Sequence, residues 1–309
     1  MQVRLGKRAR IIDEGGQAYP VDLLRDHTLK QIREKYTDEA GELTLEVGEE
    51  VPDDVVTIGG RVMFLRNTGK LCFTSLQDGF TESSNGERLQ VMLSKALVGE
   101  QALAAWKSDV DLGDFVWVKG FVARSRRGEL SVMATEWKMA SKALRPLPTL
   151  HKELGEETRV RRRYADLVAR EEARQMVRVR AAITRAIRTT LDELGFLEIE
   201  TPILQLVHGG AAARPFNTHL NAFDIGMSLR IALELYLKRA MVGGMDRVYE
   251  MGRVFRNEGI DSNHSAEFTM LEAYMSWGNQ FTIAEVIQQI IVRAADALGG
   301  RQIQTEQGV

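Results

Sequence analysis

Four titratable side chains are grouped around a glycine turn between residues 247 and 275: Arg256, Glu258, His264 and Glu267, around Gly259. The flanking segments, 247–254 and 268–275, are rich in β-branched and aromatic residues, which is typical of strands. A polar loop held between two rigid strands is a common place for ligand chemistry. A charged hairpin tip in water has the same composition, so these residues by themselves leave both interpretations open.

The composition limits the class of protein. A chain of 309 residues with 44% hydrophobic content predicts about two domains. The net charge of −2 excludes a uniformly basic surface, so any nucleic-acid contact must be a local patch. The single cysteine, Cys72, excludes an internal disulfide and fits a reducing compartment. Since no apolar run approaches the roughly 20 residues of a membrane span, we expect a cytoplasmic protein without membrane or signal segments.

The first half of the chain has the pattern of a small β-barrel. Residues 1–50 form a polar N-terminal extension with a weak helical pattern near 27–36. Five strands are predicted at 55–65, 71–76, 89–93, 115–122 and 130–137, with a helix at 100–106. A helix between the third and fourth strands is typical of an OB-fold, which we assign to residues 51–140. A small β-sandwich is the alternative.

The second half mixes helices and strands. Two prolines between residues 140 and 148 indicate a linker, assigned to 141–160, and a second domain follows at 161–309. The basic run at 159–163 fits either a solvated helix face or a contact with phosphate or another domain. Helices are predicted at 179–194 and 233–242, and a last helix begins with a capping box of Thr282 and Glu285. Short strands are predicted at 196–199 and 228–231.

Three strings stand in order along this second half: GFLEIETPIL at 195–204, GGAAARPFNTHLNAFD at 209–224, and RIALELYLKRAMVGG leading to VFRNEG at 230–259. Together they resemble a class II lysyl-tRNA synthetase of the bacterial type, with the first string similar to motif 1 and VFRNEG similar to motif 2. The resemblance implies an α+β chain, in which an N-terminal OB-fold barrel precedes part of an antiparallel-sheet catalytic domain.

The resemblance also implies a reaction and its ligands. Lysine and ATP give lysyl-adenylate, and the lysyl group then passes to a lysine tRNA. Family members continue into a third, glycine-rich motif that this chain does not contain, so the expected ligands of Mg²⁺ lie beyond it and the activity of the chain itself is in question. The helix and strand of motif 1 imply a homodimer interface.

Roles for individual residues follow from the same resemblance. Arg256 matches the catalytic arginine that contacts the α-phosphate of ATP and the lysine carboxylate. The other ATP-binding residues are implied to be Glu258, His264 and Phe268. Lysine is implied to contact Gly210, Glu234, Arg256, Glu272 and Tyr274, with Glu234 at the α-amino group and Glu272 at the ε-ammonium group.

In the barrel, the resemblance assigns anticodon recognition to four residues: Arg66, Phe73, Gln90 and Glu136. Phe73 is the stacking aromatic, and the others contact bases or phosphate. Taken alone, Gln90 and Glu136 are ordinary exposed strand residues. Two rival functions stay open: a non-catalytic RNA-binding module, and a lysyl-transfer enzyme fused to a membrane domain.

Overall fold

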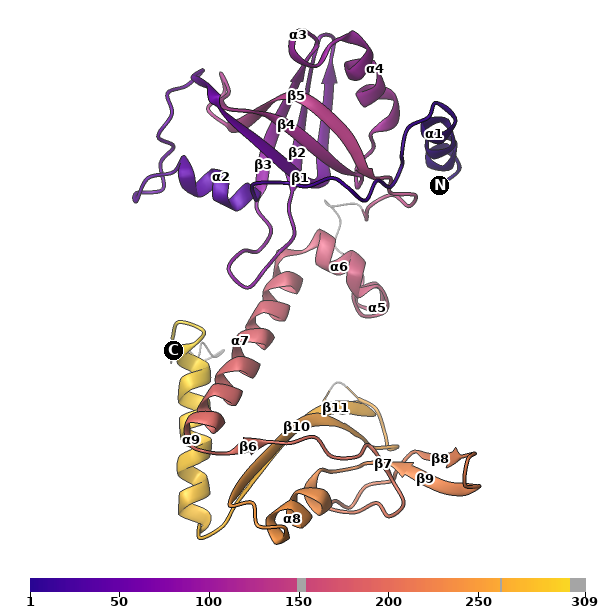
Figure 1. Cartoon of the computed structure of the whole chain (residues 1–309), viewed down its shortest axis with the longest axis vertical. Coiled ribbons are helices and arrows are strands. Elements are labelled where there is room, and N and C mark those ends of the chain that lie inside the picture. Colours follow the sequence, from indigo (N-terminus) through magenta and orange to yellow (C-terminus); the bar gives the residue numbers. More distant parts are fainter. Residues whose placement is uncertain (149–153, 262, 301–309) are drawn as a thin grey trace. The chain divides into compact units, whose positions relative to one another are not determined.

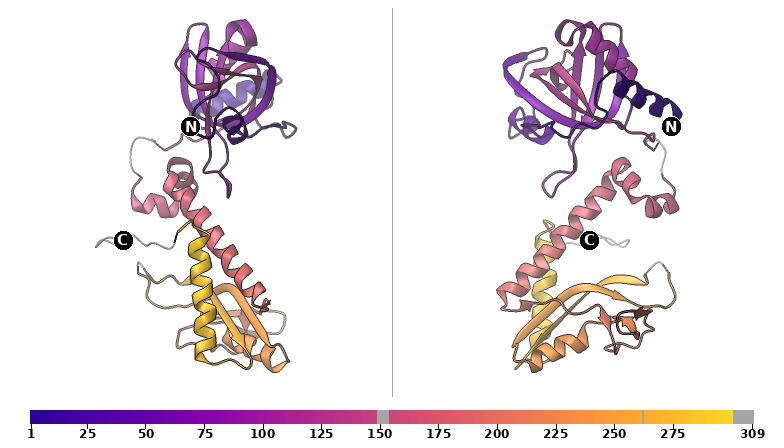
Figure 2. Two further views of the ribbon diagram at one scale, coloured as in Figure 1. Left: turned by 90° about the vertical axis from the view of Figure 1, so that its left-hand side faces the viewer. Right: turned by 45° about the vertical axis from the view of Figure 1, so that its right-hand side comes forward.

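The computed structural model describes residues 1–148, 154–261 and 263–300. It divides into two compact units, one of which ends at Arg178 while the other starts at Val179. Figure 1 labels the elements of each unit, and Figure 2 gives two further views of them. Within the described residues, no helix combines the length and the apolar character that crossing a bilayer requires.

The first unit contains a closed barrel of five strands in the order β1-β2-β3-β5-β4. The strands are β1 (Glu50–Thr68), β2 (Leu71–Gln77), β3 (Arg88–Ser94), β4 (Phe115–Arg124) and β5 (Leu130–Ser141). Helices α3 (Lys95–Val98) and α4 (Glu100–Asp109) connect the third strand to the fourth. The predicted OB-fold is therefore confirmed, and the β-sandwich is excluded because the sheet closes on itself.

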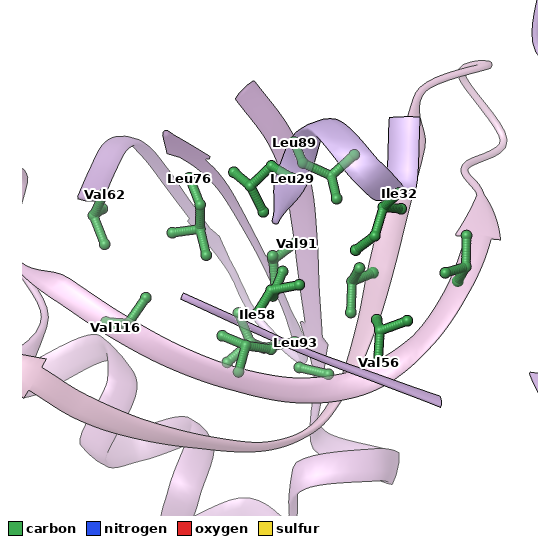
Figure 3. Packing of buried hydrophobic residues seen from close by; sticks show 14 of the residues in the cluster. Leu29, Ile32, Val56, Ile58, Val62, Leu76, Leu89, Val91, Leu93 and Val116 are labelled. Atoms are coloured by element: carbon green, nitrogen blue, oxygen red, sulfur yellow. The ribbon is translucent and has the colours of Figure 1, made fainter. Parts of the chain in front are cut away.

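The core of the barrel includes side chains from outside its strands. Leu29 and Ile32 of α2 (Leu29–Lys35) are fully buried with Val91 and Ile58 in one cluster (Figure 3). Helix α2 starts at a capping box in which Thr28 accepts from the backbone N–H of Gln31. The N-terminal extension thus supplies part of the packing that closes the barrel interior.

Helix α1 (Gln2–Asp13) was not anticipated from the sequence. None of its residues is fully buried, and Ile11 packs against the barrel core as a partly buried side chain. Its basic side chains also hold it: Lys7 pairs with Asp111 at 2.7 Å, and Arg10 pairs with Asp109.

Lys142 anchors the chain where it leaves the barrel. Its side chain is fully buried, and Nζ lies 2.6 Å from carboxylate oxygens of both Asp111 and Asp114. The ammonium group also donates to the Asp109 carbonyl at 2.6 Å, which satisfies its three donors. Because a buried ammonium is tolerated only when paired, this cluster fixes the segment after β5 to the barrel.

The second unit has a three-stranded sheet in the order β11-β10-β6. Strands β10 (Arg247–Phe255) and β11 (Glu267–Met275) form the predicted antiparallel hairpin, and β6 (Leu197–Glu198) pairs with β10 in parallel. One face of the sheet packs against α7 (Glu171–Glu193) and α9 (Gln280–Asp296) around Leu191, Tyr249 and Val286. The opposite face packs against α8 (Glu234–Val242) around Leu237 and Val254.

Two local predictions were wrong. The last helix begins at Gln280, because Asn279 is the N-cap and forms the capping box with Thr282, so the predicted pairing of Thr282 with Glu285 does not occur. The strand predicted at 228–231 is β9 (Ile225–Leu229), which forms a small sheet with β7 (Leu204–Gln205) and β8 (Asn217–Leu220). Arg230 lies outside the strand, since its side chain turns into a buried ion pair described below.

Candidate active site and RNA-binding face

The candidate ligand-binding residues of β11 share one face of the sheet. Side chains alternate along a strand, so Phe268, Glu272 and Tyr274 point to the same side. Phe268 and Tyr274 pack with Leu233 and Leu237, which identifies this side as the one covered by α8. The odd-numbered residues Leu271 and Ala273 pack against α7 and α9 instead.

Arg256 follows β10 directly and is held from two sides. Its backbone N–H donates to the Ala266 carbonyl at 2.9 Å, and its Nε donates to the Ile231 carbonyl at 3.3 Å. The guanidinium group lies 5.2 Å from the centre of the Phe268 ring. No carboxylate of the described residues pairs with it, so its charge and remaining donors are available to an anion.

Glu272 is oriented by two hydrogen bonds. One carboxylate oxygen accepts the backbone N–H of Leu233 at 3.0 Å, and the other accepts the Tyr274 hydroxyl at 2.8 Å. Burial raises the pKa of Tyr274 well above its ordinary value, and the hydrogen bond to Glu272 and the negative charges of Glu272 and Glu234 raise this pKa further. Tyr274 therefore stays a neutral donor, and the two carboxylates lie close enough to act on one phenol.

Glu234 is the first residue of α8 and faces the loop that carries Gly210. Its Oε1 lies 2.5 Å from Nζ of Lys238, one helical turn on. Gly210 has φ +87°, and a β-carbon there would lie 2.8 Å from Cβ of Glu234. The loop thus approaches the glutamate as closely as only glycine permits.

The two remaining candidates, Glu258 and His264, lie in the loop between strands β10 and β11. His264 contacts Asp261 through Nδ1 at 2.8 Å, and the backbone N–H groups of Asn263 and His264 also donate to Asp261. These bonds lower the pKa of the Asp261 carboxyl. His264 and Glu258 are both exposed, and neither forms a hydrogen bond or ion pair with Arg256 in the described part of the chain.

Three of the four candidate anticodon-binding residues lie at neighbouring positions on the barrel sheet. Arg66 pairs with Phe73 across β1 and β2, and Gln90 of β3 lies opposite Ser75, two residues along β2 from Phe73. Cross-strand partners and residues two apart share a face, so these side chains form one outer surface. Gln90 donates to Ser131 of β5 at 2.8 Å, which fixes its amide.

Glu136 lies farther along the outer surface. It follows the register shift between Lys119 and Gly120 of β4, and it forms an exposed ion pair with Lys138 at 3.1 Å. Phe64, which sequence reasoning did not select, is opposite Ser75 and is 52% exposed. An exposed aromatic in the same row as Gln90 adds a second stacking surface to this face.

Comparison with known proteins identifies both units. Residues 56–140 match the family model of the OB-fold nucleic acid binding domain (tRNA anticodon), and residues 155–307 match that of class II tRNA synthetases (D, K and N). The chain therefore contains an OB-fold domain followed by a class II tRNA synthetase domain. Its relatives include lysine–tRNA ligases of Kineococcus radiotolerans and Mycobacterium bovis, 57% and 54% identical over 99% of this chain.

The chain spans 59% of the length of each of these two relatives. A further relative is the lysylphosphatidylglycerol biosynthesis bifunctional protein of Rhodococcus jostii, 42% identical over 98% of this chain and 25% of that protein.

The synthetase domain also contains a buried ion pair that the sequence did not reveal. Arg230 Nη1 lies 2.5 Å from Oε1 of Glu250, and its Nε donates to the Arg253 carbonyl at 2.8 Å. Thr201 donates to the other oxygen of Glu250 at 2.5 Å. A β-carbon on Gly252 would lie 2.3 Å from Arg230 Nη2, so this glycine makes room for the guanidinium group.

This cluster lies directly beside the candidate active site. The carbonyl of Arg230 accepts the N–H of Phe255 at 2.9 Å, and the next carbonyl, of Ile231, accepts Arg256 Nε. The ion pair therefore fixes the segment that orients Arg256 and leads into Glu234. The available signal in the sequence was an arginine immediately before an apolar stretch, with a glutamate at an inward position of β10.

Proposed function

We propose that the protein represented by this chain is a lysine–tRNA ligase. The observation that carries the proposal is the position of Glu272, whose carboxylate is held by Leu233 and Tyr274 on the sheet face where Arg256 contacts Phe268. A fixed anionic group at one end and an unpaired guanidinium group at the other match the ε-ammonium and carboxylate ends of lysine.

Each end of the substrate has a group to bind it. Glu272 accepts the ε-ammonium group, while Tyr274, kept neutral by its surroundings, orients that carboxylate. Glu234 accepts the α-amino group, which would replace the Lys238 ammonium that now pairs with it. Arg256 binds the substrate carboxylate and the α-phosphate of ATP, because its planar fork can bond oxygens of both.

In the first step, a carboxylate oxygen of lysine attacks the α-phosphorus of ATP, the bond to the β-phosphate oxygen breaks, and pyrophosphate leaves. In the second step, a hydroxyl at the tRNA 3′ end attacks the lysyl carbonyl carbon and AMP leaves. Arg256 stabilises the charge that develops on the α-phosphate, and Phe268 offers its ring to adenine. Glu258 and His264 are proposed to reach ATP from the exposed loop.

The family implies Mg²⁺ together with ATP. The described residues contain no group of three or more His, Cys, Asp or Glu side chains placed to hold a metal ion. We therefore assign the metal no ligand among the described residues and derive no step through it.

The barrel is proposed to bind the anticodon of a lysine tRNA. Phe73 and Phe64 would stack with bases, Gln90 would contact a base edge, and Arg66 would contact a base or phosphate. Glu136 would contact a base only where the RNA extends along the barrel past Phe73, since the glutamate lies beyond the β4–β5 register shift.

The proposed enzyme is a cytoplasmic homodimer. Support for the dimer comes from exposed apolar side chains between residues 197 and 207: Leu197, Ile203, Leu204, Leu206 and Val207. Such a group of apolar side chains is typical of an interface. Analytical ultracentrifugation at micromolar concentration should give a dimer, and Leu206→Asp should give a monomer; a monomeric parent would contradict the proposal.

The lysine site is tested by calorimetric titration of the chain with lysine and with norleucine, which lacks the ε-ammonium group. Glu272→Gln should weaken lysine binding by about 1.5–3 kcal/mol, the value of a hydrogen bond to a charged group. The control is Glu267→Gln, on the same strand but exposed and paired only loosely with Arg253 at 3.6 Å. Equal affinity of the parent for lysine and norleucine would rule out the proposed site.

Transfer of lysine to a lipid is the second candidate function. It rests on the resemblance to the bifunctional Rhodococcus protein, at 42% identity compared with 57% for the Kineococcus ligase. The higher identity and the candidate RNA face of the barrel favour the tRNA ligase.

A further inference from the structure

A cavity of about 490 Å³ lies in the first unit, next to helices α5 (Glu156–Arg161) and α6 (Arg163–Ala169). Three arginines from separate segments line it: one from β1, one from the segment after β5, and one between α5 and α6. These are Arg61, Arg145 and Arg162, with Leu147, Pro148 and Tyr164 among the other lining residues. No carboxylate is found among the described residues that line the cavity.

None of these three guanidinium groups has a carboxylate partner in residues 1–148, 154–261 and 263–300. Arg61 donates to the Gly113 carbonyl at 3.2 Å and stacks on Phe115, 4.3 Å from the ring centre, so neutral groups fix its orientation. Among the described residues, the cavity therefore concentrates positive charge without a carboxylate to balance it.

The arginines of the basic run at 159–163 differ in whether they have a carboxylate partner. Arg161 pairs with Glu157 at 2.9 Å and Arg163 pairs with Asp166 at 2.8 Å, both along their own helices. Arg162 lies between the two helices, has no such partner in the described chain and lines the cavity. Of these three neighbours, only Arg162 is thus free to bind an external anion.

The wall that carries Arg145 is rigidly held. Asp114, itself paired with the buried Lys142, accepts the N–H of Ala143 at 2.8 Å. Arg4 of α1 donates to the Arg145 carbonyl at 3.3 Å. Gly113 has φ +95°, and a β-carbon there would lie 2.9 Å from Cγ of Leu147, so this glycine lets the segment pack against the barrel.

We propose that this cavity binds a phosphate of the tRNA backbone, at a nucleotide separate from those read by the barrel face. Arg61 and the anticodon candidate Arg66 are five residues apart on β1, or about 17 Å along an extended strand. Three arginines above apolar side chains suit a phosphodiester and its ribose, which position an RNA without reading its sequence. The inference rests on the proposed binding of tRNA.

The test uses the 309-residue chain and two tRNAs that differ only in the anticodon. Arg162→Ala and Arg145→Ala should each lower the affinity for both tRNAs by the same factor. Each should also reduce the slope of log affinity against log salt by about 1, the loss of one phosphate contact. The matched control is Arg161→Ala, which removes the same charge from an exposed, paired position outside the cavity and should keep the parent slope.

The outcomes separate this inference from the proposed function. If Phe73→Ala weakens tRNA binding but Arg145→Ala and Arg162→Ala leave the salt slope unchanged, the phosphate site is disproved and anticodon binding stands. If the parent binds neither tRNA better than an unrelated RNA, the proposed tRNA function fails. Binding of AMP without RNA, abolished by Arg162→Ala, would identify a free nucleotide as the occupant and overturn the RNA assignment.

Since Arg145 and Arg162 are exposed, both variants should melt at the temperature of the parent. A variant that melts lower is replaced by Arg→Gln at the same position, which keeps the hydrogen-bonding side chain and removes the charge. The same loss of salt slope is then expected.

Discussion

Gly210 and Glu234 come from segments 24 residues apart, yet a β-carbon on the glycine would lie 2.8 Å from Cβ of the glutamate and 3.5 Å from its Oε2. The loop of Gly210 therefore forms one wall around the carboxylate proposed to bind the α-amino group. With φ +87°, the glycine also adopts a backbone conformation that other residues reach only with strain.

Gly210→Ala should weaken lysine binding by about 1–3 kcal/mol, because the alanine must displace the loop or the glutamate and adopt a strained backbone conformation. Isothermal titration with lysine measures the change. Gly259→Ala is the matched control, since a β-carbon on Gly259 meets no atom within 4 Å. If both variants bind lysine as the parent does, the close approach of the Gly210 loop to Glu234 does not contribute to lysine binding.

Arg230→Met should destabilise the second unit by about 3–5 kcal/mol, because it leaves Glu250 buried without its partner. The double variant Arg230→Met/Glu250→Leu should recover most of that loss. Arg253→Met removes an exposed pair with Glu267 in the same hairpin and should cost less than about 1 kcal/mol. Urea unfolding of the four proteins gives the comparison, and equal costs for Arg230 and Arg253 would contradict it.

Lysine affinity distinguishes a positioning role of Arg230 from a purely structural one. The double variant should remain folded but bind lysine and ATP less tightly, because the segment that holds Arg256 through Ile231 loses its anchor. Parent affinity in a stable double variant would show that the ion pair has no effect on the site.

The sequence predicted the barrel and the hairpin because both depend on local patterns. Alternation and turn residues define the five strands, and the β-branched and aromatic residues at 247–254 and 268–275 define the hairpin. The roles of Glu234 and Gly210 came from family resemblance alone, since no periodicity brings a loop glycine against a helix start.

Features that depend on long-range charge pairing were missed. Ion pairs join helix α1 to residues about 100 positions away, and Arg230 pairs with Glu250, 20 positions further along the chain. Neither leaves an apolar pattern in the sequence. The start of α9 was misplaced for another reason: both Asn279 and Thr282 can cap a helix, and only the structure shows which one does.

Alkaline pH should destabilise the second unit through Tyr249, whose side chain is fully buried. Burial raises the pKa of Tyr249 well above its ordinary value, and bonds to Asp192 and Glu198 raise it further. The unfolded phenol ionises near pH 10 while the folded one does not, so its stabilising contribution is complete below pH 10 and is lost as pH rises. The loss is at most about 1.4 kcal/mol per pH unit.

Urea unfolding between pH 9 and pH 11 measures this slope. Tyr249→Phe should be less stable than the parent at pH 8 but less sensitive to pH above 10. Tyr164→Phe, at an exposed tyrosine, should behave as the parent. Identical slopes for parent and Tyr249→Phe would contradict the assignment.

The 309-residue chain should bind lysine yet exchange labelled pyrophosphate into ATP at least about 100-fold more slowly than a relative of full length. The chain spans 59% of the length of its ligase relatives and lacks the glycine-rich third motif that its resemblance implies. Arg256 would then face the developing phosphate charge without the groups of that motif, and loss of one preorganised group commonly costs a factor of 10²–10³ in kcat. Lysine-dependent exchange is the assay, with lysine titration as proof that the protein is folded. Rapid exchange that disappears in Arg256→Ala would show instead that residues 1–309 contain a complete catalyst.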